Sequence, residues 1–186
     1  MRTALSAVLA ALLLPAASAV ATAHAHAQNK SYVIQSNVQI GSYKLSVDPT
    51  LQGALEVFGA PTRVKRGPVD GWNSCTARWA EHGVSIWFYN LAGQDSCKPQ
   101  YGAFGSATLT DKRWRTAKGL RIGDTFQKLT RLYLPRHFIG KWVVLLSELR
   151  RADCSLPKGC LYPKLEAKVM DGRVVAFRVN ATAGGV

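Results

Sequence analysis

The sequence predicts an exported α+β protein made of two tandem repeats, each a short helix packed on an antiparallel sheet. Three observations lead to this prediction. The chain opens with the three zones of a secretory signal peptide. Apolar residues then recur with the periods of amphipathic helices and half-buried strands. The helical pattern returns about 75 residues further along, which is typical of an internal repeat.

Residues 1–27 are the predicted signal peptide. Arg2 supplies the positive charge, the stretch from Leu5 to Leu14 is uncharged and mostly apolar, and small residues follow. This stretch is shorter than the roughly 18 residues of a spanning helix, and no later segment replaces it, so we expect no transmembrane segment. Cleavage after Ala27 is one of several small-residue sites. Cleavage after Ala23 would place His26 third in the chain, a terminus suited to Cu(II) or Ni(II).

The rest of the chain divides into two predicted repeats, residues 28–110 and 111–186. All 11 acidic residues and 23 of the 24 basic residues lie beyond residue 27, so this part has a net charge of +12. In an exported chain such a surplus favours a partner protein or an anionic polymer of the cell envelope over nucleic acid. A solvated basic surface with no specific partner would have the same composition.

The four cysteines are an even number in an exported chain, which favours disulfides over a metal site or a reactive thiol. Of the three pairings that four cysteines allow, we expect Cys75–Cys97 and Cys154–Cys160. The members of each pair are close in sequence, and each pair falls in one half of the chain. No C-x-x-C spacing occurs and the histidines do not complete a zinc set, so we expect no metal or cofactor.

The first repeat is predicted to open with a short amphipathic helix. Asp48 is the expected N-cap and Pro49 the first helical residue, while Gly59 and Pro61 end the helix. A hairpin follows, with its turn near His82 and alternating apolar residues after it.

The second repeat shows the same order of signals. Its helix is expected to open with Asp124 and to stop before Pro135, which places the two caps one position out of step. A second hairpin turns at Asp171-Gly172, a strong hairpin signal, and matches the first at a shift of about 90. The larger shift implies about 15 extra residues in this repeat, among which Trp142–Leu146 reads as a buried strand.

Tandem units of a helix and an antiparallel sheet, with a disulfide in each, resemble the beta-lactamase inhibitor proteins secreted by bacteria. The segment from Asp48 to Pro61 also looks like the helix motif of related small lipoproteins of outer-membrane assembly. The likeness covers roughly residues 42–180 and rests on spacing and residue type. It implies a concave sheet face that holds a target protein, and it transfers no contact residues.

No constellation of catalytic residues is evident, so we expect a binding protein and not an enzyme. His82 reads as an exposed turn residue, and His137 as a loop or helix-end residue. The carboxylates are scattered, and no nucleophile elbow, zinc-binding helix or phosphate-binding loop occurs. The alternative is a small hydrolase of the cell envelope.

The predicted binding residues are basic and aromatic, and they form two runs. An anionic partner would be neutralised by the basic side chains while the tryptophans supply apolar contact. The first run is Lys112, Arg113, Trp114, Arg115, Lys118 and Arg121; the second is Arg63, Lys65 and Arg66, near Trp72. Three further tryptophans, Trp79, Trp87 and Trp142, are expected in the core, although they would also suit a concave sheet face. The sequence leaves the oligomeric state open.

Overall fold

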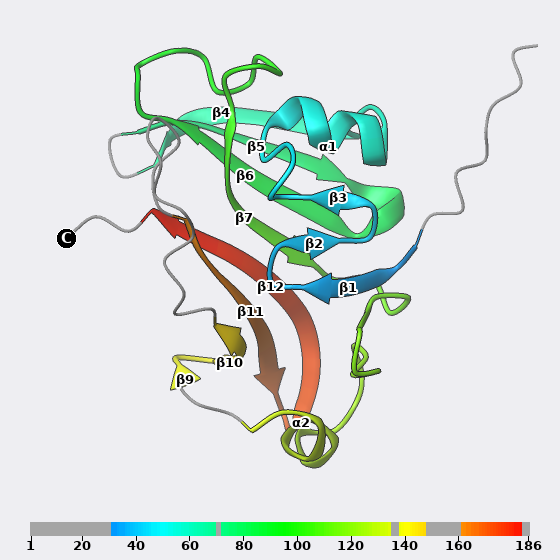
Figure 1. The fold of residues 1–186 in the computed structure, drawn as a ribbon. Helices are drawn as coiled ribbons and strands as arrows, with labels where there is room; N and C mark the ends of the chain where they lie inside the picture. Colours follow the sequence, from blue (N-terminus) through cyan, green and yellow to red (C-terminus); the bar gives the residue numbers. More distant parts are fainter. Residues whose placement is uncertain (1–30, 70–71, 135–137, 148–160, 184–186) are drawn as a thin grey trace, which may run out of the picture.

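The structure is a computed structural model that describes residues 31–69, 72–134, 138–147 and 161–183. Its largest element is an antiparallel eight-stranded sheet with the strand order β4-β5-β6-β7-β12-β11-β10-β9 (Figure 1). The strands are β4 (Arg63–Val69), β5 (Trp72–Trp79), β6 (Val84–Asn90), β7 (Ala103–Leu109), β9 (Phe138–Ile139), β10 (Trp142–Ser147), β11 (Leu161–Met170) and β12 (Arg173–Ala183). The mixed α+β class is confirmed, with strand as the dominant element.

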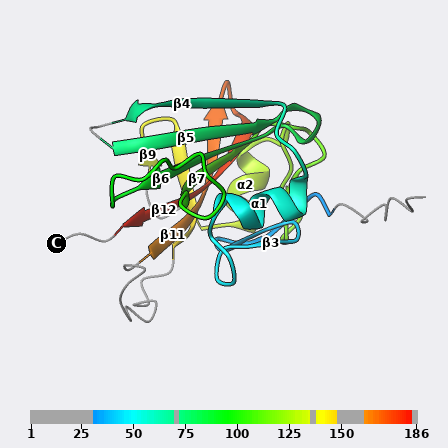
Figure 2. The same ribbon diagram turned by 90° about the horizontal axis from the view of Figure 1, so that it is seen from above.

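A second, smaller sheet was not predicted. It has the order β3-β2-β1-β8, and β8 runs parallel to β1. Its strands are β1 (Val33–Ser36), β2 (Gln39–Ile40), β3 (Tyr43–Lys44) and β8 (Arg115–Thr116). Figures 1 and 2 show that this sheet and both helices lie on one face of the large sheet. Among the described residues, neither helix is long or apolar enough to span a bilayer.

Helix α1 (Leu51–Phe58) begins two residues later than the sequence suggested. Thr50 is the N-cap, and its Oγ1 accepts a hydrogen bond from Gly53 N at 3.4 Å. Asp48 instead accepts from the Thr50 amide and hydroxyl, at 3.0 and 2.6 Å. The carboxylate therefore fixes the capping residue and does not cap the helix itself. The predicted end is confirmed, because Gly59 terminates the helix with a φ of 78°.

Helix α2 (Phe126–Leu132) has Thr125 as its N-cap, one residue after the predicted Asp124. Thr125 Oγ1 accepts from Lys128 N at 3.2 Å, while Asp124 accepts from the backbone of Arg121. The predicted misalignment of the two caps is therefore wrong. Both caps are threonines, and Thr125 follows Thr50 by the same 75 positions that relate the helices.

The core lies between the large sheet on one side and the helices and small sheet on the other. Strand alternation directs every second side chain into it, as in β6, where Val84, Ile86 and Phe88 are buried. Trp79 is fully buried, as predicted, and its Nε1 donates to Gly59 O at 2.8 Å. One connected apolar cluster results, and it reaches residues of both helices.

Both predicted hairpins are present. β5 and β6 are joined through a 3-10 turn, η1 (Ala80–His82), and β11 and β12 through Asp171 and Gly172, both with positive φ. The predicted buried strand is confirmed as β10. In chain order, α1 precedes β4–β7 and α2 precedes β9–β12, and the two groups of strands meet where β7 pairs with β12.

The Cys75–Cys97 disulfide is confirmed, and it ties β5 to the loop between β6 and β7. The predicted Cys154–Cys160 disulfide, the signal peptide and His137 lie outside the described residues.

Candidate functional site

The first predicted basic run is a loop that surrounds β8. The side chains of Lys112, Arg113, Arg115, Lys118 and Arg121 are exposed. The aromatic residue of the run is not available for contact, because Trp114 is only 1% exposed. Its indole Nε1 donates to His82 O at 2.8 Å, and its ring meets the edge of Tyr32. The prediction that Trp114 contacts a ligand is therefore wrong.

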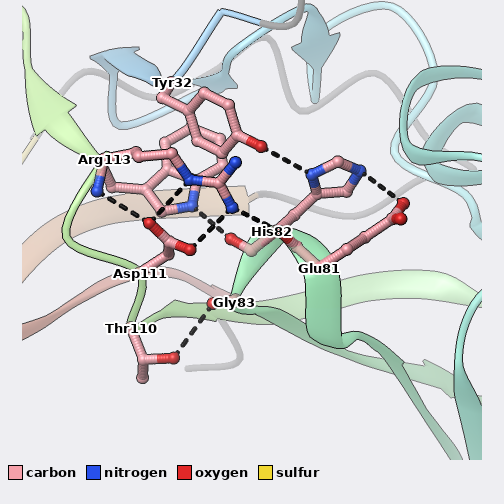
Figure 3. Close-up of polar contacts among 8 residues, drawn as sticks. Tyr32, Glu81, His82, Gly83, Thr110, Asp111 and Arg113 are labelled. Carbon is pink, nitrogen blue, oxygen red and sulfur yellow. Dashed lines mark hydrogen bonds and ion pairs between the residues drawn. The ribbon is translucent and has the colours of Figure 1, made fainter.

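His82 lies in the predicted turn but is 5% exposed, so the expectation of an exposed histidine is wrong (Figure 3). Its Nε2 lies 2.9 Å from Glu81 Oε1, and its Nδ1 lies 2.9 Å from Tyr32 OH. A carboxylate partner at Nε2 favours the proton on that nitrogen, so Nδ1 accepts from the tyrosine hydroxyl. The interaction joins the start of the described chain to the large sheet.

Arg113 completes this polar cluster (Figure 3). Its Nη2 lies 2.7 Å from Asp111 Oδ2, it also donates to Glu81 O, and its guanidinium stacks 4.2 Å from the Tyr32 ring centroid. Hydrogen bonds from Arg113 lower the pKa of Asp111 from 3.8 to about 2. These groups contact one another across three chain segments. We therefore interpret the cluster as a structural contact that holds the start of β1 against the large sheet.

The second predicted run lies on β4, an edge strand of the large sheet. Arg63 and Lys65 point to the same side as Arg78 and Thr76 of β5, which pair with them. Arg66 points to the opposite side, where its Nε lies 3.5 Å from Asp95 Oδ2. The side chain of Trp72 lies outside the described part of the chain. The structure thus places the two basic runs on different elements.

The strongest candidate site is the face of the large sheet opposite the helices, which we call the open face. Both end strands, β4 and β9, lie on the side away from α1 and β3, so the sheet curves around this face (Figure 2). By strand register, the charged and aromatic side chains on the open face are Arg63, Lys65, Arg78, Trp87, Tyr89, Trp142, Lys164, Glu166, Lys168 and Arg178.

Around Trp142, the open face carries a compact arrangement of charges. Arg178 Nε lies 2.5 Å from Glu166 Oε2, and the arginine guanidinium lies 4.2 Å from the Trp142 ring centroid. Lys168 Nζ approaches the same ring at 5.9 Å. Glu166 is 1% exposed, whereas the Arg178 side chain is 25% exposed. The buried Glu166 carboxylate therefore holds Arg178 in place, and of these two residues a binding partner can reach only the Arg178 side chain.

A second aromatic group lies on β6. Trp87 and Tyr89 stack with ring centroids 5.4 Å apart and an interplanar angle of 26°. Gly105 of β7 makes room for the indole, since a Cβ there would lie 2.1 Å from Trp87 Cε3. Trp87 Nε1 is buried and has no hydrogen-bond partner among the described residues. The core prediction is thus wrong for Trp87 and for Trp142, because both are partly exposed on the open face.

Comparison with known proteins gives no precedent for this arrangement. No family model, curated protein or solved structure matches the chain. The chemistry of the open face indicates what this face can bind.

That chemistry is strongly basic. Lysine and arginine side chains lie on β4, β5, β11 and β12, and Glu166 is the only carboxylate on the described part of the face. Since Glu166 is already paired with Arg178, the remaining cations leave a positive surface. Such a surface attracts an acidic partner over distance and selects it on contact.

Several residues of the open face were missed in the sequence. Arg78, Tyr89, Lys164, Glu166, Lys168 and Arg178 were not singled out. For Lys164, Glu166, Lys168 and Arg178, the signal is a period of two across the hairpin at Asp171-Gly172, which fixes the register and places Glu166 opposite Arg178. For Arg78 and Tyr89, the same period runs across the hairpin of β5 and β6.

Proposed function

We propose that this protein is an exported, non-catalytic binding module that holds an acidic surface of a partner protein on its open face. The observation that carries the proposal is the placement of Trp87, Tyr89 and Trp142 on a curved sheet face with basic side chains, of which only Arg178 has a carboxylate partner among the described residues. Tryptophan, tyrosine and arginine dominate the binding energy of protein interfaces. Their placement on a broad face suits the surface of a protein more than a small molecule, which needs an enclosing pocket.

Binding would proceed in two stages. The positive field of the face accelerates encounter with an acidic surface, and this stage weakens as salt is added. Docking then buries the aromatic rings, which supplies affinity that salt affects much less. Glu166 holds Arg178 against Trp142, so these side chains lose little conformational freedom when the partner binds.

The architecture supports the same proposal. Each helix is followed by four strands of the large sheet, and each is capped by a threonine, an order that we interpret as two tandem repeats joined at β7 and β12. This interpretation keeps the resemblance to the secreted beta-lactamase inhibitors, which also implies a binding role. The Cys75–Cys97 disulfide supports an oxidising compartment outside the cytosol.

The test is capture of partners from the cell envelope and the culture medium by the immobilised protein. A double variant, Arg78→Glu with Lys168→Glu, reverses charge on both halves of the open face. Arg131→Glu, at an exposed residue of α2, is the control away from the open face; it reverses one charge where the double variant reverses two. Circular dichroism establishes that each variant is folded.

We expect a partner protein that is retained by the wild type and by Arg131→Glu but not by the double variant. The same partner, once purified, should bind the wild-type protein directly. Retention of only an anionic polymer, or equal capture by the double variant, would overturn the proposal. Trp87→Ala should lower affinity at high salt as well as at low salt, because it removes apolar contact and not charge.

A further inference from the structure

Two arginines lie opposite each other on the side of the molecule that faces away from the open face. Arg115 of β8 and Arg121 form an antiparallel bridge, so their side chains leave the backbone side by side. Both are exposed, whereas Trp114, Thr116 and Leu120 next to them are buried. Like charges directly opposite each other are unfavourable in a sheet. A bound anion would offset this repulsion between the two arginines.

The backbone of this hairpin is fixed on both sides of its turn. Thr116 N donates to Leu120 O at 2.8 Å, and Arg115 N donates to Tyr32 O at 3.0 Å. Arg121 N donates to Asp124 Oδ2 at 2.7 Å. The backbone that carries the two arginines is therefore held rigidly, and the bridge places the two residues directly opposite each other.

Two neighbouring cations of the same run, Arg113 and Lys118, already have partners. Arg113 is paired with Asp111, and Lys118 Nζ donates to Leu132 O at 3.3 Å while lying 4.8 Å from the Tyr133 ring centroid. The carboxylate of Asp124 accepts from Lys128 Nζ at 2.8 Å and also interacts electrostatically with Arg121. Among the described residues, no carboxylate forms a close ion pair with the side chain of Arg115 or Arg121. A third guanidinium lies close by, since Arg173 Nη1 donates to Gly123 O at 2.9 Å.

We propose that Arg115 and Arg121 form an anion site that binds a phosphate group. A guanidinium binds phosphate through two parallel N–H···O bonds, and a phosphate group has enough oxygens to accept from two such forks at once. The site goes beyond the proposed function, because β8 and the small sheet lie on the helix side of the large sheet and not on the open face.

Phosphate chemistry of this kind has three sources outside the cytosol: lipid headgroups, the phosphodiesters of anionic envelope polymers, and inorganic phosphate. All three present oxygens that the arginine pair can hold. Affinity for any of them should fall with rising salt, because the arginines are exposed.

The first experiment measures thermal unfolding in sodium phosphate and in sodium chloride of equal ionic strength. Phosphate should raise the Tm of the wild-type protein and of the control Arg131→Gln. The increase should be lost in Arg115→Gln and in Arg121→Gln. Binding titrations with inorganic phosphate should show affinity weaker by about tenfold or more in each of these two variants, as expected for removal of a charged hydrogen-bonding group.

Two further arms identify the source. One measures sedimentation with vesicles of phosphatidylglycerol in phosphatidylcholine, compared with vesicles of phosphatidylcholine alone. The other measures binding to soluble poly(glycerol phosphate). A response to one of these ligands that is lost in Arg115→Gln and Arg121→Gln names that source, and a response to inorganic phosphate alone names the free ion.

The proposal is overturned if phosphate raises the Tm equally in the wild type, Arg115→Gln and Arg121→Gln, because the effect would then be a general one of the salt. It is also overturned if phosphate gives no increase over chloride in the wild type. The open-face double variant Arg78→Glu with Lys168→Glu should keep the phosphate response, so failure of either proposal is visible independently of the other.

Discussion

Glu166 and Arg178 form an ion pair between β11 and β12, with the carboxylate almost fully buried and the guanidinium partly exposed over Trp142. The two residues occupy directly opposite positions in the strand register. A buried carboxylate depends on its partner far more than an exposed cation does. This asymmetry between the two residues leads to the first prediction.

Removal of Arg178 should destabilise the protein more than removal of Glu166. Arg178→Gln leaves the buried carboxylate without its cation, at an expected cost of about 3 kcal/mol. Glu166→Gln leaves an arginine that reaches water, and should cost about 1 kcal/mol. Urea unfolding of both variants and of the double variant checks this. The double variant should be more stable than the sum of the single costs suggests, and strict additivity would contradict the pairing.

Gly105 should be intolerant of substitution because of Trp87. In Gly105→Ala the new Cβ would overlap the indole, so the ring must move from its place on the sheet, at a cost of about 1–3 kcal/mol. Gly67→Ala in β4 is the control, since a Cβ there meets nothing within 4 Å. The second-site change Trp87→Ala should make Gly105→Ala nearly neutral. An unchanged Tm in Gly105→Ala alone would show that the ring lies elsewhere.

Removal of the Cys75–Cys97 disulfide should lower stability without changing the fold. The bond closes a loop between residues 22 positions apart, for which chain entropy predicts a loss of about 3 kcal/mol in Cys75→Ala with Cys97→Ala. Equilibrium unfolding under non-reducing conditions measures the loss. Peptide mapping of the wild type provides the control, and a Cys75 peptide linked to Cys154 or Cys160 would contradict the assignment.

Asp111 should contribute to the loss of stability in acid. Its pKa is lowered from 3.8 to about 2, first by the side-chain hydrogen bond from Arg113. A lowered pKa in the folded state adds stability that is fully present above 3.8 and disappears as the pH falls through about 2. Asp111→Asn should therefore be less stable than the wild type at neutral pH, and the difference should shrink between pH 4 and pH 2.

Thermal unfolding as a function of pH measures this convergence. Asp171→Asn is the matched control, because Asp171 is exposed at the tip of a hairpin. A difference between Asp111→Asn and the wild type that stays constant from pH 7 to pH 2 would contradict a role for the ionised carboxylate.

The helices and long strands could be predicted because their signals are local. Period, turn residues and end residues placed α1, α2 and both hairpins, and Asp171-Gly172 marked the correct turn. The caps were misplaced because Asp48 and Asp124 are good capping residues that here hold a neighbouring residue or backbone group instead. The small sheet was missed because strands as short as β2 and β3 carry no periodic signal.

The binding surface was less predictable, because it depends on which way each strand faces. Trp114 lies within a basic run, yet it points inward, where its indole bonds to the backbone of His82. Trp87 and Trp142 have apolar neighbours, yet they point away from the core. Only the pairing of strands across the whole sheet, including the contact of β7 with β12, collects the basic residues of β4 and β11 on one face.

The arrangement of tryptophans gives the molecule its own optical reporters. Trp79 and Trp114 are enclosed in the core, whereas Trp87 and Trp142 are partly exposed on the open face. Ligands at the open face will alter the emission of the latter pair and leave the former unchanged, while occupancy of the arginine hairpin will leave both pairs unchanged. A change in quenching by iodide on addition of a ligand therefore reports occupancy of the open face without any added label.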